Sequence, residues 1–141
     1  MKKTVRLVTF IMLMCMASIL LCACVDKKDP IVLKESDTFI IINANENVSE
    51  DDTLVDYMTK LKESGELDFA MKNGMITSVN GIENAADFSQ CWMLYTSDTS
   101  NANDAWGTVE YNGKIYGSAT LGAELLKIKS GALYIWVYQT F

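Results

Sequence analysis

Three Asn-Gly dipeptides constrain the fold of this chain more than any other feature of its sequence. They are Asn73-Gly74, Asn80-Gly81 and Asn112-Gly113. Asn-Gly favours two-residue turns whose backbone twist matches that of a β-hairpin. Short strand-like runs flank the first and the last dipeptide, at 67–71, 75–79, 106–111 and 114–116. The second half of the chain therefore predicts antiparallel hairpins, and the runs 91–96 and 133–139 are its strongest strand candidates.

One amphipathic helix is expected before these hairpins. Leu54, Met58 and Leu61 recur at the spacing of one helical face. Ser49 has an acidic residue three positions later, which is typical of an N-cap, and Gly65 can end the helix in the left-handed conformation. A continuous β-branched run at 38–43 predicts a strand buried on both faces. The expected fold class is α+β, with one helix packed on a mainly antiparallel sheet.

The C-terminal strand candidate alternates between aliphatic and aromatic side chains. We expect its aliphatic face to pack against the helix. The aromatic face is either a second packing layer or an exposed stacking platform. The aliphatic residues are Leu133, Ile135 and Val137, and the aromatic ones are Tyr134, Trp136 and Tyr138.

The N-terminus has the pattern of an export signal. Lys2, Lys3 and Arg6 are followed by an uncharged apolar run at 7–21, which is short for a membrane-spanning helix. The run ends in Leu21-Cys22-Ala23-Cys24, which resembles the lipobox of bacterial lipoproteins.

This resemblance divides the chain and predicts its location. It implies a lipoprotein signal peptide at 1–23, a lipidated tether at 24–30 and a folded domain at 31–141, with a diacylglyceryl group on Cys24. The expected location is the bacterial cell membrane, with the lipid-anchored domain on the extracytoplasmic side. The alternatives are an ordinary secretory signal or a retained membrane anchor.

Charge and composition exclude several classes of function. Without Lys2, Lys3 and Arg6 the formal net charge changes from −6 to −9, and no arginine remains, so binding to nucleic acid is not expected. The chain has no histidine, which removes the Ser-His-Asp triad, the Cys-His pair and imidazole metal sites. Cys91 would be the only cysteine of the processed chain, and we expect a buried, inert thiol. No enzyme activity is predicted.

The polar segment 97–104 is rich in oxygen ligands of the kind that bind calcium. Counted from Asp98, the fifth position is Ala102 and the twelfth is Val109, so the ligand pattern of an EF-hand fails. A solvated hairpin loop without metal is expected there. No secondary structure is assigned to residues 118–128 from the sequence.

An ordered set of segments resembles the transcobalamin-like C-terminal domain, a β-grasp-like module of cobalamin carriers and bacterial surface lipoproteins. The resemblance covers roughly residues 35–141. It departs from the family at Ala132, where the terminal turn usually reads Gly-Asp. The segments that carry it are 53–58, 76–81, 91–95, 109–113 and 131–138.

The resemblance implies a binding module for cobalamin or another small ligand in an uptake system, with a transporter as a possible partner. Without histidine, such binding would depend on stacking, hydrogen bonds and shape, and no resident cofactor is expected. The alternative is a surface module of the adhesion or inhibitor type that binds protein or glycan. The candidate ligand-binding residues are Trp92, Trp106, Tyr134, Trp136 and Tyr138.

Overall fold

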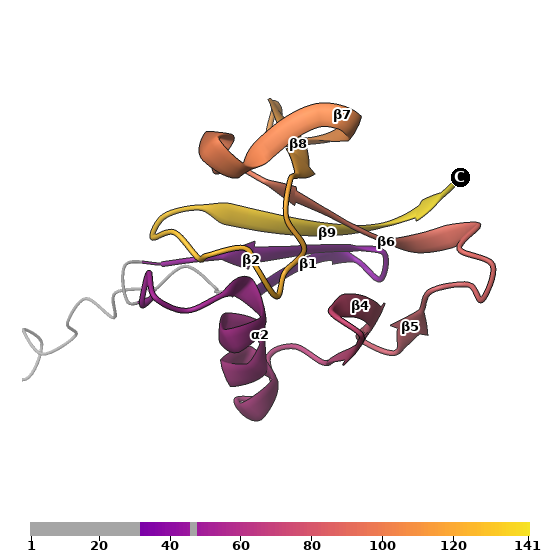
Figure 1. Ribbon diagram of the computed structural model, residues 1–141, viewed down its shortest axis with the longest axis horizontal. Helices are drawn as coiled ribbons and strands as arrows, with labels where there is room; N and C mark the ends of the chain where they lie inside the picture. Colours follow the sequence, from indigo (N-terminus) through magenta and orange to yellow (C-terminus); the bar gives the residue numbers. More distant parts are fainter. Residues whose placement is uncertain (1–31, 46–47) are drawn as a thin grey trace, which may run out of the picture.

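Antiparallel β-sheet makes up most of the described chain, which comprises residues 32–45 and 48–141 of a computed structural model. Within these residues, one α-helix accompanies the sheets (Figure 1). The predicted α+β class with one helix and mainly antiparallel strands is therefore confirmed. The expected signal peptide at 1–23, the tether at 24–30 and Cys24 lie outside the described residues.

The larger sheet has six strands in the order β1-β2-β9-β6-β8-β7, and every neighbouring pair is antiparallel. β9 is central, with β2 on one side and β6 on the other. The predicted strand at 38–43 is confirmed, since Ile40, Ile41 and Ile42 are fully buried on both faces of the sheet. The strands are β1 (Val32–Ser36), β2 (Phe39–Asn43), β6 (Gln90–Thr96), β7 (Ala102–Tyr111), β8 (Lys114–Ala119) and β9 (Leu133–Thr140).

A smaller sheet follows the helix in the order β3-β4-β5, with β3 at Phe69–Lys72, β4 at Met75–Val79 and β5 at Ile82–Glu83. The three Asn-Gly dipeptides form turns between β3 and β4, β4 and β5, and β7 and β8. All six of their residues have φ between +47° and +82°. The hairpins predicted from these dipeptides are confirmed.

The helix, α2, spans Leu54–Glu63 and begins later than the expected N-cap at Ser49. Thr53 is the N-cap, because its hydroxyl accepts from the backbone N–H of Asp56 and its own N–H donates to the Asp56 carboxylate. This capping box also lowers the pKa of Asp56. Both Ser49 and Thr53 are followed by an acidic residue three positions later. The helix begins after Thr53, where the apolar face starts at Leu54. The helix ends at Ser64 and Gly65, as expected.

Both faces of the central strands are covered. α2 and β3–β5 lie on one face of the large sheet, and the β7–β8 hairpin folds over the other (Figure 1). The expectation that the aliphatic face of β9 packs on the helix is wrong. Tyr134 and Trp136 share the main core with Leu54, Met58 and Leu61. The aliphatic side chains of β9 instead form the second core with Ile41, Tyr95 and the β7–β8 hairpin.

The expected solvated loop at 97–104 is also corrected. Asp98 is 4 % exposed, Thr99–Asn101 form a 3-10 turn, and β7 begins at Ala102. Residues 118–128, for which the sequence predicts no element, first complete β8 and then run back to α2. There Lys127 forms an isolated antiparallel β-bridge with Thr53. Among the described residues, no helix is long and apolar enough to cross a membrane.

Candidate functional site

A groove of about 360 Å³ brings all three tryptophans of the chain together. It lies beside β6, between the start of β4 and the part of β7 around Trp106, where the pairing with β8 is interrupted. Its remaining wall is the loop that follows β8. The lining residues are Gly74, Met75, Ile76, Asn84, Cys91, Trp92, Met93, Leu94, Trp106, Ala119, Thr120, Leu121, Gly122, Ala123 and Trp136.

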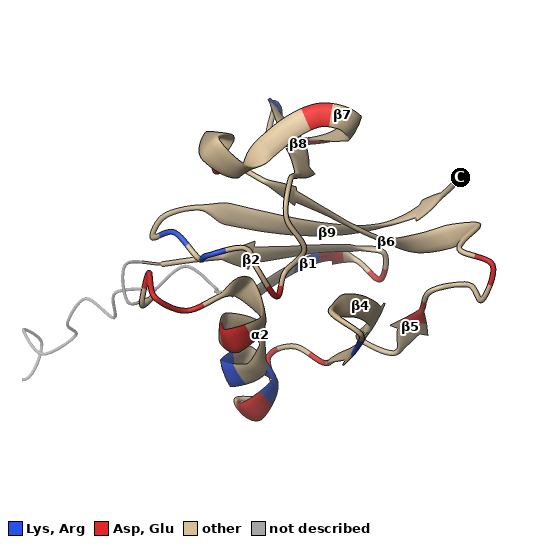
Figure 2. Cartoon of the chain, in the orientation of Figure 1, with Lys and Arg blue, Asp and Glu red and all other residues tan. Residues whose placement is uncertain are grey.

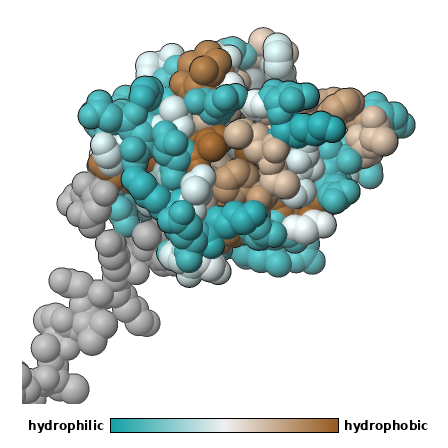
Figure 3. Space-filling model, turned by 60° about the horizontal axis from the view of Figure 1, so that its bottom comes forward, coloured by the Kyte–Doolittle hydropathy of each residue, from teal (hydrophilic) through white to brown (hydrophobic). Residues whose placement is uncertain are grey.

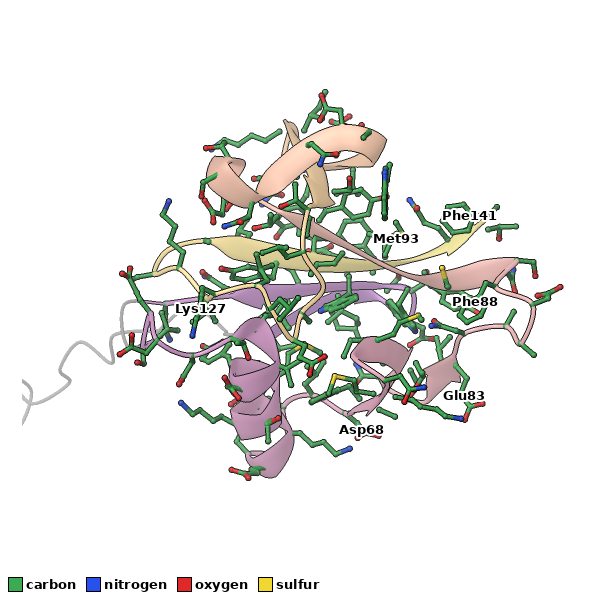
Figure 4. All side chains as sticks on the ribbon, in the orientation of Figure 1. Asp68, Glu83, Phe88, Met93, Lys127 and Phe141 are labelled. Carbon is green, nitrogen blue, oxygen red and sulfur yellow. The ribbon has the colours of Figure 1, made fainter. Side chains whose placement is uncertain are left out.

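The floor of the groove is an uncovered part of the β6 edge. β9 pairs with β6 from Gln90 to Thr96, whereas β8 pairs with it only at Tyr95 and Thr96. Residues 91–94 therefore have one edge that no described strand covers, and all four line the groove. Met93 faces the β7–β8 side of the sheet (Figure 4), and Trp92 and Leu94 face the main core.

Asn84 closes this edge and joins the two sheets. Its side-chain oxygen accepts from the backbone N–H of Trp92, and its side-chain nitrogen donates to the carbonyl of Ile76, each at 2.9 Å. The amide is therefore engaged at both ends and contributes structure to the groove wall. Sequence reasoning missed Asn84, because it lies among other polar residues before β6, such as Glu83 and Asp87, and nothing in the sequence distinguishes it.

Trp92 and Trp136 form the buried part of the groove, being 5 % and 4 % exposed. The Trp92 Nε1–H donates to the carbonyl of Ile82 at 2.8 Å, and its ring lies 5.4 Å from that of Tyr138. The Trp136 Nε1–H is buried and has no acceptor among the described residues. An unpaired buried donor is costly, so Trp136 is held there by packing rather than by hydrogen bonding.

Trp106 is the exposed member of the trio, with 72 % of its surface accessible. The register between β7 and β8 jumps from Asn103↔Ser118 to Thr108↔Gly117. The four residues 104–107 consequently have no partner on β8 and form a wide bulge. Bulges commonly redirect a side chain near a binding site. Here the bulge presents Trp106 at the groove while β7 continues into its hairpin.

The other two candidate residues lie outside the groove lining. Tyr134 is fully buried, and its hydroxyl accepts from the backbone N–H of Lys129 at 2.8 Å. Tyr138 is partly buried against Trp92, and its hydroxyl donates to the carbonyl of Glu83. The structure thus gathers Trp92, Trp106 and Trp136 at the groove and gives the two tyrosines structural contacts.

One carboxylate, that of Glu124, lies beside the groove, although no charged residue lines it. Glu124 follows the lining residue Ala123, and its carboxylate lies against Gly74, so close that a Cβ on Gly74 would be 2.4 Å from its Oε2. Asp104 belongs to the bulge that carries Trp106, but it lines a different cavity together with Lys114. Both carboxylates are exposed, and neither has an ion-pair partner in the described part of the chain. Figure 2 shows acidic residues on α2, β5 and β7 and in several loops.

The face carrying α2 and β3–β5 is hollowed and apolar at its centre. Figure 3 shows hydrophobic side chains gathered there, surrounded by hydrophilic ones. Exposed apolar side chains at the groove rim are Met75 and Leu121, at 49 % and 41 %. No sequence pattern marks the loop 119–123 as a wall of the groove, because its residues are small or aliphatic and show no strand or helix period.

The buried Asp98 anchors the turn that precedes β7. Burial by itself raises its pKa, but hydrogen bonds from Ser100, Asn101 and Lys129 outweigh burial and lower the pKa to about 2. No group of three metal-ligating side chains is formed within the described ranges.

Cys91 borders the groove as a free thiol of intermediate exposure. Burial raises its pKa, which keeps the thiol protonated near neutral pH. This environment is the opposite of the one that activates a nucleophilic cysteine. The groove therefore offers aromatic and apolar contact, with little acid-base chemistry.

Comparison with known proteins adds no relative to this description. The chain matches no family model, and it matches neither a curated protein nor a solved structure.

Proposed function

We propose that this protein is a membrane-anchored extracytoplasmic module that binds a small molecule in the tryptophan groove. The observation that carries the proposal is the convergence of Trp92, Trp106 and Trp136 on one concave site. Small-molecule sites typically measure ~300–1,000 Å³ and are lined mainly by apolar and aromatic side chains. A groove of about 360 Å³ lies at the small end of that range.

The proposed activity is binding without catalysis. Cys91 is the titratable thiol in the lining, and its raised pKa disfavours the thiolate. Asn84 uses both polar atoms of its side chain within the protein. The lining thus supplies contact area and shape, and no acid-base pair.

We also propose a relationship to the transcobalamin-like C-terminal domain, with a β-grasp-like arrangement. In support, a hairpin precedes the helix, and the last strand, β9, lies beside that hairpin in the middle of the sheet. Cobalamin is accordingly the first ligand to test. A groove of this volume would hold one edge or side chain of a corrinoid, so its affinity should be modest, about micromolar or weaker.

The anchor is proposed to be lipid on Cys24. The chain from Cys24 to Val32 can span at most ~28 Å, which would keep the folded domain close to the membrane surface. Two acyl chains are enough for stable attachment. A site so close to the membrane suits delivery of a ligand to a transporter in the same membrane.

Membrane fractionation with metabolic labelling by a radioactive fatty acid tests the anchor. Cys24→Ser should abolish labelling and release the protein or leave an unprocessed precursor. Cys22→Ser is the matched control, because it changes the neighbouring cysteine and keeps Leu21, Ala23 and Cys24. If Cys24→Ser stays processed, labelled and membrane-bound, the lipoprotein assignment is wrong.

Tryptophan fluorescence tests the binding function with the processed full chain in detergent micelles. Cobalamin should quench the emission saturably after correction for its own absorption. Trp106→Ala should weaken this binding about tenfold, because it removes one exposed aromatic contact surface. Phe88→Leu is the control, since Phe88 is exposed but lines a different cavity. Absence of saturable binding by cobalamin and by a panel of small molecules would favour the surface module that binds protein or glycan.

A further inference from the structure

We propose that the ligand of the tryptophan groove is a small organic cation, an alkylated ammonium group that packs against the indole of Trp106 and the groove floor. This inference rests on the proposed binding function and narrows its ligand class. It follows from the combination of indole rings in the lining with the unpaired Glu124 carboxylate at the rim.

The aromatic part of the argument concerns the space beside Trp106. Of the aromatic side chains, tryptophan attracts a cation most strongly over its ring face. No ring contact joins Trp106 to Trp92 or Trp136 in the described part of the chain, whereas Trp92 contacts Tyr138 at 5.4 Å. The exposed indole is therefore not stacked on the buried pair, and the groove occupies the space that they border.

The electrostatic part concerns Glu124. The Glu124 carboxylate lies against Gly74 in the groove wall. No lysine in the described ranges forms an ion pair with it. The nearest lysine in sequence to Gly74 is Lys72, which borders another cavity. The field at the groove therefore favours cations and opposes anions.

Other ligand chemistries fit the groove less well. A phosphate or carboxylate would meet this negative field without any lysine or arginine in the lining. A sugar requires several free donors and acceptors, whereas the lining offers few, chiefly the Thr120 hydroxyl and the buried Trp136 Nε1–H, and the Asn84 amide already has partners at both ends. An alkylated ammonium needs neither, because its methyl groups are satisfied by apolar and aromatic contact.

Two probes of nearly equal shape test the charge directly. Choline carries a quaternary ammonium, and 3,3-dimethylbutan-1-ol replaces that group by a neutral tert-butyl group. The three indole N–H signals of the ¹⁵N-labelled, processed full chain in micelles report on the groove, one for each tryptophan. Choline should shift the Trp106 signal saturably and bind at least about tenfold more tightly than the alcohol. Raising the salt concentration should weaken choline binding alone.

Variants separate the aromatic from the electrostatic contribution. Trp106→Ala should reduce choline affinity about tenfold, and Trp106→Phe should retain part of it. Glu124→Gln should reduce choline affinity about two- to threefold and leave binding of the alcohol unchanged. Glu110→Gln is the control, because Glu110 is an exposed carboxylate of β7 outside the groove lining. Circular dichroism establishes that each variant is folded.

The outcomes distinguish this inference from the proposed function. Equal binding of choline and the alcohol overturns the proposal that the ligand is a cation, and it leaves a groove that binds neutral ligands. Failure of both probes up to about 20 mM, while cobalamin or another uncharged molecule binds, overturns it in the same way. Failure of every small molecule overturns the proposed function as well.

Discussion

The side-chain oxygen of Asn84 accepts the backbone N–H of Trp92 at 2.9 Å, and this bond holds the open edge of β6. The same amide donates to Ile76 on β4, so one side chain connects the small sheet to the large one. Without Asn84, the buried Trp92 N–H would face the groove unpaired. The groove therefore exists partly because a side chain replaces the missing neighbour of β6.

Asn84→Ala should destabilise the fold by about 1–3 kcal/mol, because it leaves the Trp92 N–H and the Ile76 carbonyl without their partner. Urea unfolding followed by circular dichroism measures the change. Thr120→Ala is the matched control: Thr120 also lines the groove, but its exposed hydroxyl makes no hydrogen bond in the described structure. It should change stability by less than about 0.5 kcal/mol. Equal effects of the two variants would contradict the role assigned to Asn84.

Asp98 should make stability fall at acidic pH. Its pKa is about 2 in the folded protein, against the ordinary value of 3.8, so the folded state binds this proton more weakly than the unfolded chain. The stabilisation is fully present above pH ~4 and is lost as the pH falls through about 2, a contribution of about 2 kcal/mol. Other aspartates with lowered pKa values, such as Asp56, add to the same trend.

Urea unfolding at a series of pH values tests this assignment. Asp98→Asn should be less stable than the natural protein at pH 7 and should lose less stability between pH 4 and pH 2. Asp104→Asn is the control, since Asp104 is exposed and makes no side-chain hydrogen bond within the described ranges. An unchanged acid profile in Asp98→Asn would show that the network does not hold the charged form.

Two buried tyrosines should respond differently to loss of their hydroxyl. Tyr57 is 8 % exposed, and its hydroxyl has no partner among the described residues. Tyr57→Phe should therefore keep or slightly raise stability. Tyr134→Phe should cost about 1–2 kcal/mol, because the Lys129 N–H loses its acceptor at 2.8 Å. Thermal unfolding of the pair compares them directly, and a larger loss in Tyr57→Phe would show that its hydroxyl has a partner.

Sequence patterns predicted the elements better than the faces they present. Asn-Gly turns are recognisable because they need two residues with positive φ, and Asn73, Asn80 and Asn112 have it. The orientation of β9 was not predictable from alternation, because β9 lies between two cores and both of its faces are buried. Aliphatic and aromatic side chains then satisfy burial equally well, so alternation alone does not determine which face meets the helix.

The residues of the site were also easier to predict than their arrangement. Trp92, Trp106 and Trp136 were identified by residue type, which is a property of the sequence. Their convergence depends on the bulge at 104–107 and on the short β6–β8 pairing, which are tertiary features. No local pattern marks a jump in register, so neither the groove nor the part played by Asn84 could be predicted.

Gly117→Ala should disturb the bulge that carries Trp106. Gly117 lies where the register with β7 jumps, and a Cβ added there would be 2.7 Å from the backbone oxygen of Asn103. Backbone atoms must shift to make room, so the variant should lose about 1–3 kcal/mol and displace the start of the bulge. Gly122→Ala is the matched control on the groove wall, since its added Cβ would be 3.8 Å from the nearest atom, the Gly74 oxygen, which is an ordinary contact.

Thermal unfolding measures the loss of stability. Acrylamide quenching measures the exposure of Trp106, in a chain in which Trp92 and Trp136 are replaced by phenylalanine. The exposure of Trp106 should change in Gly117→Ala and stay constant in Gly122→Ala. Equal stability and equal quenching in the two variants would show that Gly117 is not needed for the close approach of β7 and β8.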